Sequence, residues 1–183
     1  MHLIKQYIHR QILNRAYLQT RRKVQMLNMD SIHSVGILTN PGNSKELNEY
    51  EQVVQLFQDI KKKVFPFIYI DKKAEIILSA DKKDNLVFLT KANFNWLGKP
   101  KAEDELLEFQ NKEFDILIDL SFSPVFGLQY LFVASKARLK ISPIATFGES
   151  YSDFTLSIPA EEGKDFFVKE IIRYLQIINK TKK

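Results

Sequence analysis

The chain has 183 residues, 45% of them hydrophobic, and this length and apolar content predict one compact domain with a full core. It contains no cysteine, which excludes disulfide bonds, cysteine-based zinc sites and thiol redox chemistry. The formal net charge of +5 is unevenly distributed, because residues 1–27 hold six cations and no acid while the remainder holds 21 basic and 22 acidic residues.

Residues 3 to about 27 are predicted to form one helix, because they lack Gly and Pro and are rich in helix-forming residues. The cations are scattered around this helix, which disfavours a membrane surface and suits a polyanion such as RNA, on the ribosome above all. Tyr7 and Tyr17 are placed to stack on bases. The alternative is a solvated face whose basic side chains only cover apolar surface. The predicted polyanion-binding residues of this basic arm are Lys5, Arg10, Arg15, Arg21, Arg22 and Lys23.

The same N-terminal segment is neither a secretory signal nor a membrane span. Lys5, His9, Arg10 and Arg15 interrupt every apolar run, whereas a span needs about 18 or more apolar residues. We therefore expect no integral membrane span and a cytoplasmic location.

From residue 34 onward, short apolar segments alternate with amphipathic ones, and we expect one α/β domain over residues 34–180. Strands are predicted at 34–39, 64–70, 86–89, 114–120 and 139–141, with an edge strand at 154–158. Helices are predicted at 43–62, 103–110, 127–138 and 164–179, and residues 75–78 fit either a short helix or a strand. This alternation predicts a three-layer, Rossmann-like, mostly parallel sheet with an extra basic N-terminal helix.

Residues 92–101 hold the only tryptophan, Trp96, close to Phe94 and to three lysines. Aromatic and cationic residues together are typical of binding hot spots, so this loop is a candidate contact for a protein partner. The interpretation that we favour is that Phe94 and Trp96 close the core beneath a helix.

Polar residues follow the predicted strands at their carboxyl ends, where parallel sheets bind ligands. They form a candidate small-molecule pocket, but ordinary strand exits and helix caps are the interpretation that we favour, because the turn Asn-Pro-Gly-Asn-Ser matches neither a dinucleotide fingerprint nor a phosphate loop. For Asp119, capping the next helix is the favoured role over holding a ligand hydroxyl. The candidate pocket residues are Asn40, Asn43, Ser44, Asp71, Asp119 and Ser121.

No arrangement of residues predicts a catalytic centre. His2, His9 and His33 are the only histidines, and none has the neighbours of a metal site or a catalytic triad. Asp115 and Asp119 lie at opposite ends of one strand, about 13 Å apart, which is too far for a pair acting on one substrate atom. We therefore predict no catalytic residue, no metal and no cofactor.

The segment FDILIDLSF…LQYLFVASKARLKIS, with the KANFNWLGKPK loop and the YSDFTLSI strand, resembles an uncharacterised family of small Bacteroidota proteins that is a domain of unknown function. A second similarity is to the N-terminal half of heptosyltransferase-like glycosyltransferases, in which such a strand is followed by a helix, a small-residue basic segment and a further strand. The residues that carry it here are Asp115, Ile118, Asp119, Leu120, Ala134, Lys136, Ala137, Arg138 and Ile141. This resemblance implies a Rossmann-like layout. In those two-domain enzymes a second domain holds most of the nucleotide-sugar, and this chain has no residues left to build one.

The sequence as a whole predicts a non-enzymatic binding or adaptor protein whose basic N-terminal helix contacts a polyanion. The alternative is a reduced glycosyltransferase-like or nucleotide-binding domain with its pocket at the carboxyl ends of the strands.

Overall fold

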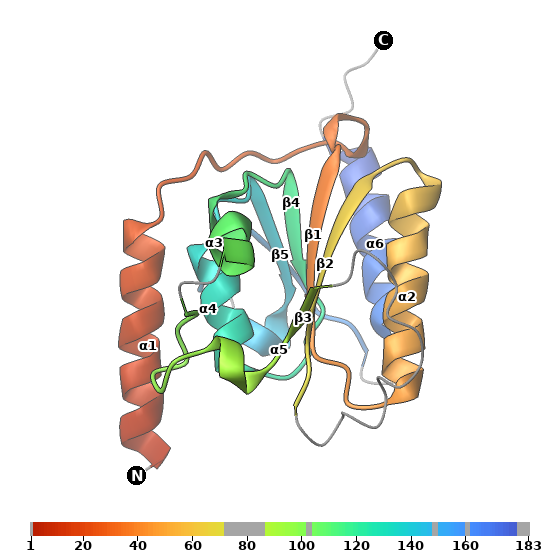
Figure 1. Cartoon of the computed structure of the whole chain (residues 1–183). Helices are drawn as coiled ribbons and strands as arrows, with labels where there is room; N and C mark the ends of the chain where they lie inside the picture. Colours follow the sequence, from red (N-terminus) through yellow and green to blue (C-terminus); the bar gives the residue numbers. More distant parts are fainter. Residues whose placement is uncertain (1, 72–86, 102–103, 148–149, 160–161, 179–183) are drawn as a thin grey trace.

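The computed structural model describes residues 2–71, 87–101, 104–147, 150–159 and 162–178 (Figure 1). Within these ranges one sheet carries helices on both faces, which confirms the predicted Rossmann-like α/β fold with an additional N-terminal helix. The strands are β1 (Ser34–Thr39), β2 (Lys63–Tyr69), β3 (Val87–Leu89), β4 (Ile116–Asp119), β5 (Leu139–Pro143) and β6 (Phe154–Leu156). The α-helices are α1 (His2–Gln19), α2 (Ser44–Asp59), α3 (Asp104–Asn111), α4 (Phe126–Ala134), α5 (Ile144–Phe147) and α6 (Lys164–Ile177). Two described segments form short 3-10 helices, η1 (Met29–Ser31) and η3 (Lys91–Asn93).

The six strands run in the order β3-β2-β1-β4-β5-β6, and every described pair is parallel. The predicted parallel pairing and the edge position of β6 are therefore confirmed, and residues 75–78 lie outside the described residues. All carboxyl ends consequently meet at one edge of the sheet, the lower edge in Figure 1. The strand order reverses between β1 and β4, which is where open α/β sheets commonly bind ligands.

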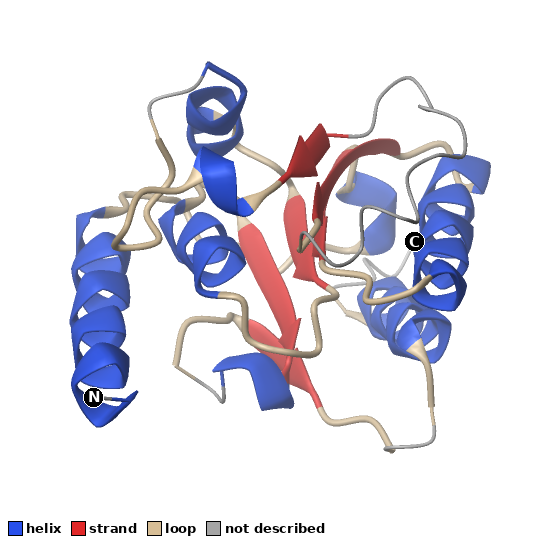
Figure 2. Cartoon of the chain, turned by 60° about the horizontal axis from the view of Figure 1, so that its bottom comes forward, coloured by secondary structure: helices blue, strands red, loops and turns tan. Residues whose placement is uncertain are grey.

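Both faces of the sheet are buried, as the near-continuous apolar strands require. In β4, Ile116 and Ile118 belong to the hydrophobic cluster shared with α2 and α6, whereas Leu117 belongs to the cluster shared with α3 and α4. α1 lies outside α4 and contributes Leu13 and Ala16 to that second cluster (Figure 2). The basic N-terminal helix is thus packed on the body of the molecule.

Two predicted helices end at least four residues earlier in the structure than in the prediction. α1 ends at Gln19 instead of residue 27: Thr20 Oγ1 donates to the Ala16 carbonyl, and the chain then crosses the molecule toward β1 (Figure 1). α4 ends at Ala134 instead of residue 138. In both places tertiary hydrogen bonds replace helical ones, since the Gln25 amide donates to the Arg138 carbonyl across the two segments.

A buried ion pair fixes the crossing segment. Arg22 donates to the Asp153 carboxylate from Nη1 at 2.7 Å and from Nη2 at 2.6 Å, and the two side chains are only 6% and 14% exposed. The Lys140 amide of β5 donates to the same carboxylate at 2.8 Å. Arg22 also reaches the Ala137 carbonyl, at 3.2 Å. The pair therefore connects the N-terminal segment to β5 and to the start of β6.

Lys140 is itself buried, which is unusual for a lysine inside a strand. Its Nζ donates to the Val133 carbonyl at 2.7 Å, close to the carboxyl end of α4, where a cation is favourable. Burial, with Arg22 nearby, lowers the pKa of Lys140 to about 7. This lysine therefore anchors α4 to β5 and titrates near neutral pH.

Asp115 closes the opposite, amino edge of the sheet. Its carboxylate accepts the backbone amides of His33 and Ser34, at 2.8 and 3.0 Å, and Nη1 of Arg138, at 3.0 Å. Burial alone raises the pKa of Asp115, but these hydrogen bonds and that of the Ser34 hydroxyl outweigh it and hold the pKa below its ordinary value. Asp115 is therefore a structural carboxylate that joins the starts of β1, β4 and β5.

The buried pair gives the first testable prediction. We expect Arg22→Gln to lower the free energy of unfolding by about 3 kcal/mol, because it leaves the Asp153 carboxylate buried without its guanidinium partner. Arg21→Gln is the matched control, since Arg21 is the adjacent exposed arginine. Urea unfolding at pH 7 measures both variants, and equal stabilities would contradict a structural role for Arg22.

Candidate functional site

The exits of β1 and β4 bring together three of the six predicted pocket residues: Asn40, Asp119 and Ser121. The Leu120 amide donates to the Leu38 carbonyl at 2.7 Å, and Asn40 Nδ2 donates to Ser123 Oγ at 3.0 Å, so the two exits are bonded directly to each other. Asn40 Oδ1 is buried and has no hydrogen-bond partner among the described residues. The point at which the strand order reverses is therefore polar and tightly connected.

Asp119 is the most buried carboxylate of this cluster, at 2% exposure. Burial raises its pKa to about 6, although the hydroxyl and amide of Ser121 and the charge of Lys164 act in the opposite direction. Its Oδ1 accepts the Ser121 amide at 2.9 Å, two residues along the chain. The prediction that Asp119 caps the next helix is wrong, because Val125 precedes α4 and supplies no side-chain cap. Asp119 instead stabilises the turn after β4.

The amino end of α2 already holds a carboxylate of its own. Asn43 Oδ1 accepts the Glu46 amide at 2.9 Å and so caps α2, and Glu46 accepts Asn43 Nδ2 at 2.9 Å and the Gly42 amide at 3.2 Å. Lys164 Nζ, from the start of α6, lies 3.3 Å from Glu46. Dinucleotides in Rossmann folds place their pyrophosphate at the amino end of the helix that follows the first strand. In this chain the Glu46 carboxylate occupies that end of α2, and its negative charge would repel a phosphate.

The remaining predicted pocket residues are Asn43, which caps α2, and Ser44 and Asp71. Ser44 is the exposed first residue of α2, and Asp71 is exposed beyond the end of β2. Sequence reasoning missed Lys164, which the fold brings from α6 to Glu46 at this edge. No local pattern marks Lys164, because its burial depends on how α6 packs against α2.

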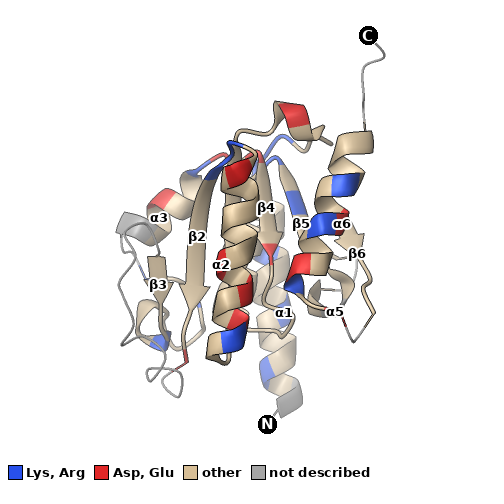
Figure 3. Ribbon diagram, turned by 90° about the vertical axis from the view of Figure 1, so that its right-hand side faces the viewer, with Lys and Arg blue, Asp and Glu red and all other residues tan. Residues whose placement is uncertain are grey.

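The six predicted polyanion-binding residues divide into two groups. Arg22 is enclosed by the fold and paired with Asp153, so we leave it out of the binding surface. The other five are exposed and make no ion pair with another described residue: Lys5, Arg10, Arg15, Arg21 and Lys23. The ribbon in Figure 3 marks several acidic positions along α2 and only basic charged positions on α1, so these two sides of the molecule differ in charge.

The loop after β3 corrects one prediction. Phe94 is buried as predicted, but Trp96 is 90% exposed, so the prediction that Trp96 closes the core is wrong. Asn95 Oδ1 accepts the Leu97 and Lys99 amides, and Gly98 takes a φ of 74°, which together form a tight loop that leaves the indole outside. This loop and α1 line a common hollow of about 450 Å³.

Among the described residues, no group of three or more His, Asp or Glu side chains is placed to hold a metal ion. No helix in the described part of the chain is long and apolar enough to cross a membrane.

The profile of a family of unknown function, DUF6913, matches residues 5–178, which run from α1 to the end of α6. The chain belongs to the DUF6913 family. The matched range includes the basic helix, so α1 is part of the unit that defines DUF6913. No curated protein and no solved structure matches the chain, and the similarity to glycosyltransferases gains no support from these comparisons.

Asp119 gives the second testable prediction. The pKa of Asp119 is higher in the folded than in the unfolded protein, so its ionisation lowers the free energy of unfolding. This loss is absent below pH 4, grows between pH 4 and about pH 6, and is constant above about pH 6. We therefore expect Asp119→Asn to be more stable than the parent above pH 6, by up to about 3 kcal/mol, and to show no such gain at pH 4.

Urea unfolding at pH 4, 5, 6 and 7.5 measures this difference. Asp30→Asn, at an exposed acid, is the control and should show no gain across this range. A gain for Asp119→Asn that is the same at pH 4 and pH 7.5 would contradict the raised pKa.

Proposed function

We propose that this DUF6913 protein is a binding or adaptor protein that uses α1 and the segment after it to hold a ribonucleoprotein surface, of which the ribosome is the first candidate. The observation that carries the proposal is the uncompensated charge of this segment. The exposed cations of α2 and α6 have acidic partners within their own helices, as in Lys45–Glu49, Lys169–Asp165 and Arg173–Glu170. The acid-free N-terminal segment offers no such partner, so its charge is free to attract phosphates.

Exposed aromatic side chains accompany these cations. Tyr7 is 65% exposed and Tyr17 is 42% exposed, and Trp96 stands on the loop that shares a hollow with α1. Bases stack on such rings regardless of sequence. The combination supports contact with single-stranded RNA segments.

α1 also exposes apolar side chains that RNA alone does not explain. Ile4 and Leu18 are 65% and 82% exposed, on the side of the helix away from Leu13 and Ala16. A surface built of both RNA and protein would match the cations and the apolar side chains at once. For this reason we favour a ribonucleoprotein over free RNA.

The third testable prediction concerns salt dependence. If all five exposed cations meet phosphates, log affinity for single-stranded RNA falls with log salt with a slope of about −3.5 to −4.5, since each contact contributes about 0.7–0.9. We expect the triple variant Lys5→Gln, Arg10→Gln, Arg15→Gln to bind more weakly and to reduce that slope by about 2–3. Fluorescence anisotropy of a labelled RNA at several salt concentrations measures both quantities.

The matched control is Lys45→Gln, Lys169→Gln, Arg173→Gln, which removes the same charge from the other side of the molecule and should leave the slope unchanged. Equal losses in the two triple variants would show that net charge, and not α1, governs the binding.

The fourth testable prediction separates ribonucleoprotein from RNA. We expect Ile4→Ser, Leu18→Ser to reduce co-sedimentation with ribosomes about tenfold while the affinity and salt slope for free RNA stay unchanged, because these side chains would contact protein. Co-sedimentation equal to that of the parent chain would contradict a protein contact on the outer side of α1.

A further inference from the structure

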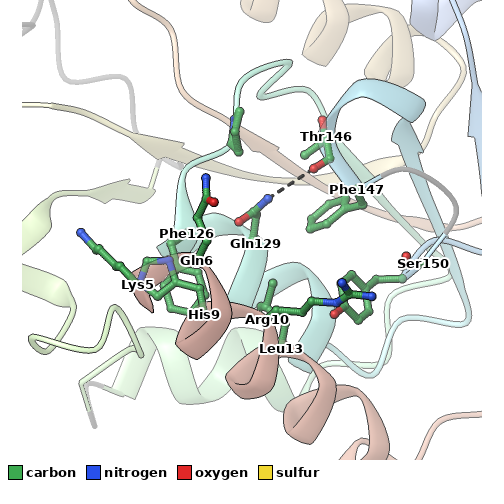
Figure 4. Close-up of a pocket in the computed structure, with 12 residues that line it drawn as sticks. Lys5, Gln6, His9, Arg10, Leu13, Phe126, Gln129, Thr146, Phe147 and Ser150 are labelled. Atoms are coloured by element: carbon green, nitrogen blue, oxygen red, sulfur yellow. Dashed lines mark hydrogen bonds between the residues drawn. The ribbon is translucent and has the colours of Figure 1, made fainter. Parts of the chain in front are cut away.

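A cavity of about 600 Å³ opens between α1 and the carboxyl edge of the sheet (Figure 4). Its lining comes from α1, from the start of α4 and from α5 with the residues that follow it. This volume lies within the range of about 300–1,000 Å³ that is usual for small-molecule sites. It differs from the polar cluster at the β1 and β4 exits, and none of the predicted pocket residues lines it.

Aromatic rings form walls whose positions are fixed by other contacts. His9 of α1 stacks on Phe126 of α4, with ring centroids 3.7 Å apart and an interplanar angle of 17°. Phe147 stacks on Phe132 at 4.9 Å, and Tyr151 donates from its hydroxyl to Asn14 Oδ1 at 2.6 Å. The apolar part of the cavity is therefore formed before any ligand enters.

Among the described residues, the charged groups that line the cavity are all basic. Lys5 and Arg10 line it, and no acid does so among the described residues. Figure 4 shows Arg10 extending from α1 toward Ser150, and Lys5 extending to the other side of His9. Burial, followed by the charge of Lys5, lowers the pKa of His9, so its ring is a neutral hydrogen-bonding group at pH 7. The electrostatics of this space favour an anion.

The second hollow, of about 450 Å³, adjoins the cavity across the stacked rings. The two spaces share Lys5, His9 and Phe126, and the second contains Trp96 and Lys91. Each space thus pairs cations with aromatic rings. A ligand that matches both spaces carries a negative group and a planar ring. A negative group alone would leave the aromatic rings without a partner, and a planar ring alone would leave the cations without one.

We propose that the cavity between α1, α4 and α5 binds a small organic anion that carries an aromatic ring, with nucleoside phosphates as the probe class. The phosphate lies at Arg10 and the ring lies against Phe126 and Phe147. This placement differs from that of a dinucleotide in a Rossmann fold, because Glu46 occupies the amino end of α2. The anion is held instead by cations of a helix that the Rossmann fold itself does not contain.

Isothermal titration calorimetry of the full chain, without added metal, tests the proposal. The probes are the mono- and triphosphates of the four common ribonucleosides, the uncharged nucleosides, and inorganic pyrophosphate. We expect at least one nucleotide to bind at least tenfold more tightly than both its nucleoside and pyrophosphate. Absence of binding by every nucleotide, or equal binding of pyrophosphate, would overturn the proposal.

Two variants locate the site. Arg10→Gln removes one of the two cations that line the cavity and should weaken nucleotide binding tenfold or more, whereas Arg15→Gln, on the same helix but outside the cavity, should leave it unchanged. Ser150→Trp should block the cavity and abolish binding, while RNA binding through the exposed cations persists. Equal effects of Arg10→Gln and Arg15→Gln on nucleotide binding would show unspecific electrostatic attraction and would overturn the proposal. The cavity proposal does not depend on RNA binding, so a parent chain that binds nucleotides but not RNA would contradict the proposed function alone.

Discussion

The position of the N-terminal helix depends on one buried ion pair. Arg22 and Asp153 form a bidentate ion pair, and the Asp153 carboxylate also accepts the Lys140 amide of β5. These bonds hold the segment between α1 and β1 across the molecule. The Coulomb energy of such a pair is largely offset by the cost of removing both charges from water, so its main effect is to specify one arrangement. That arrangement seats Leu13 and Ala16 on the body and places Lys5 and Arg10 beside the carboxyl edge of the sheet. The surface and the cavity described above both follow from it.

The sequence predicted the strands well because the information for them is local. The apolar runs at 34–39 and 114–120 are short, bounded by turn residues and buried on both faces, and the structure places β1 and β4 within them. The early end of α1 could not be predicted, since residues 20–27 have helical propensity and tertiary contacts, among them those with Arg138 and Asp153, draw them out of the helix. The exposure of Trp96 could not be predicted for a similar reason, because a tryptophan close to Phe94 and Leu97 has the composition of a core segment.

The candidate site shows the same division between local and tertiary information. Asn40, Asp119 and Ser121 could be placed together from the rule that parallel strands end at one edge, and the structure brings them there. Nothing in the sequence distinguishes Arg22 from Arg21 and Lys23, yet the fold encloses the first and exposes the other two. The cavity was missed because its walls come from segments that are distant in sequence, and the stacking of His9 on Phe126 has no counterpart in any local pattern.

The contact between Glu46 and Lys164 has a consequence for motion. It ties α2 to α6 at the carboxyl edge, so on that face of the sheet the helices are linked by an ion pair where the strands end. On the opposite face α1 and α4 are joined by ring stacking beside two hollow spaces. Local opening costs least where few buried contacts must break. In α1 the buried side chains Leu13 and Ala16 lie in the second half of the helix, whereas Ile4, Tyr7 and Ile8 of its first turns are exposed. The first turns of α1, beside both hollow spaces, can therefore move away from α4 at less cost than the rest of the helix.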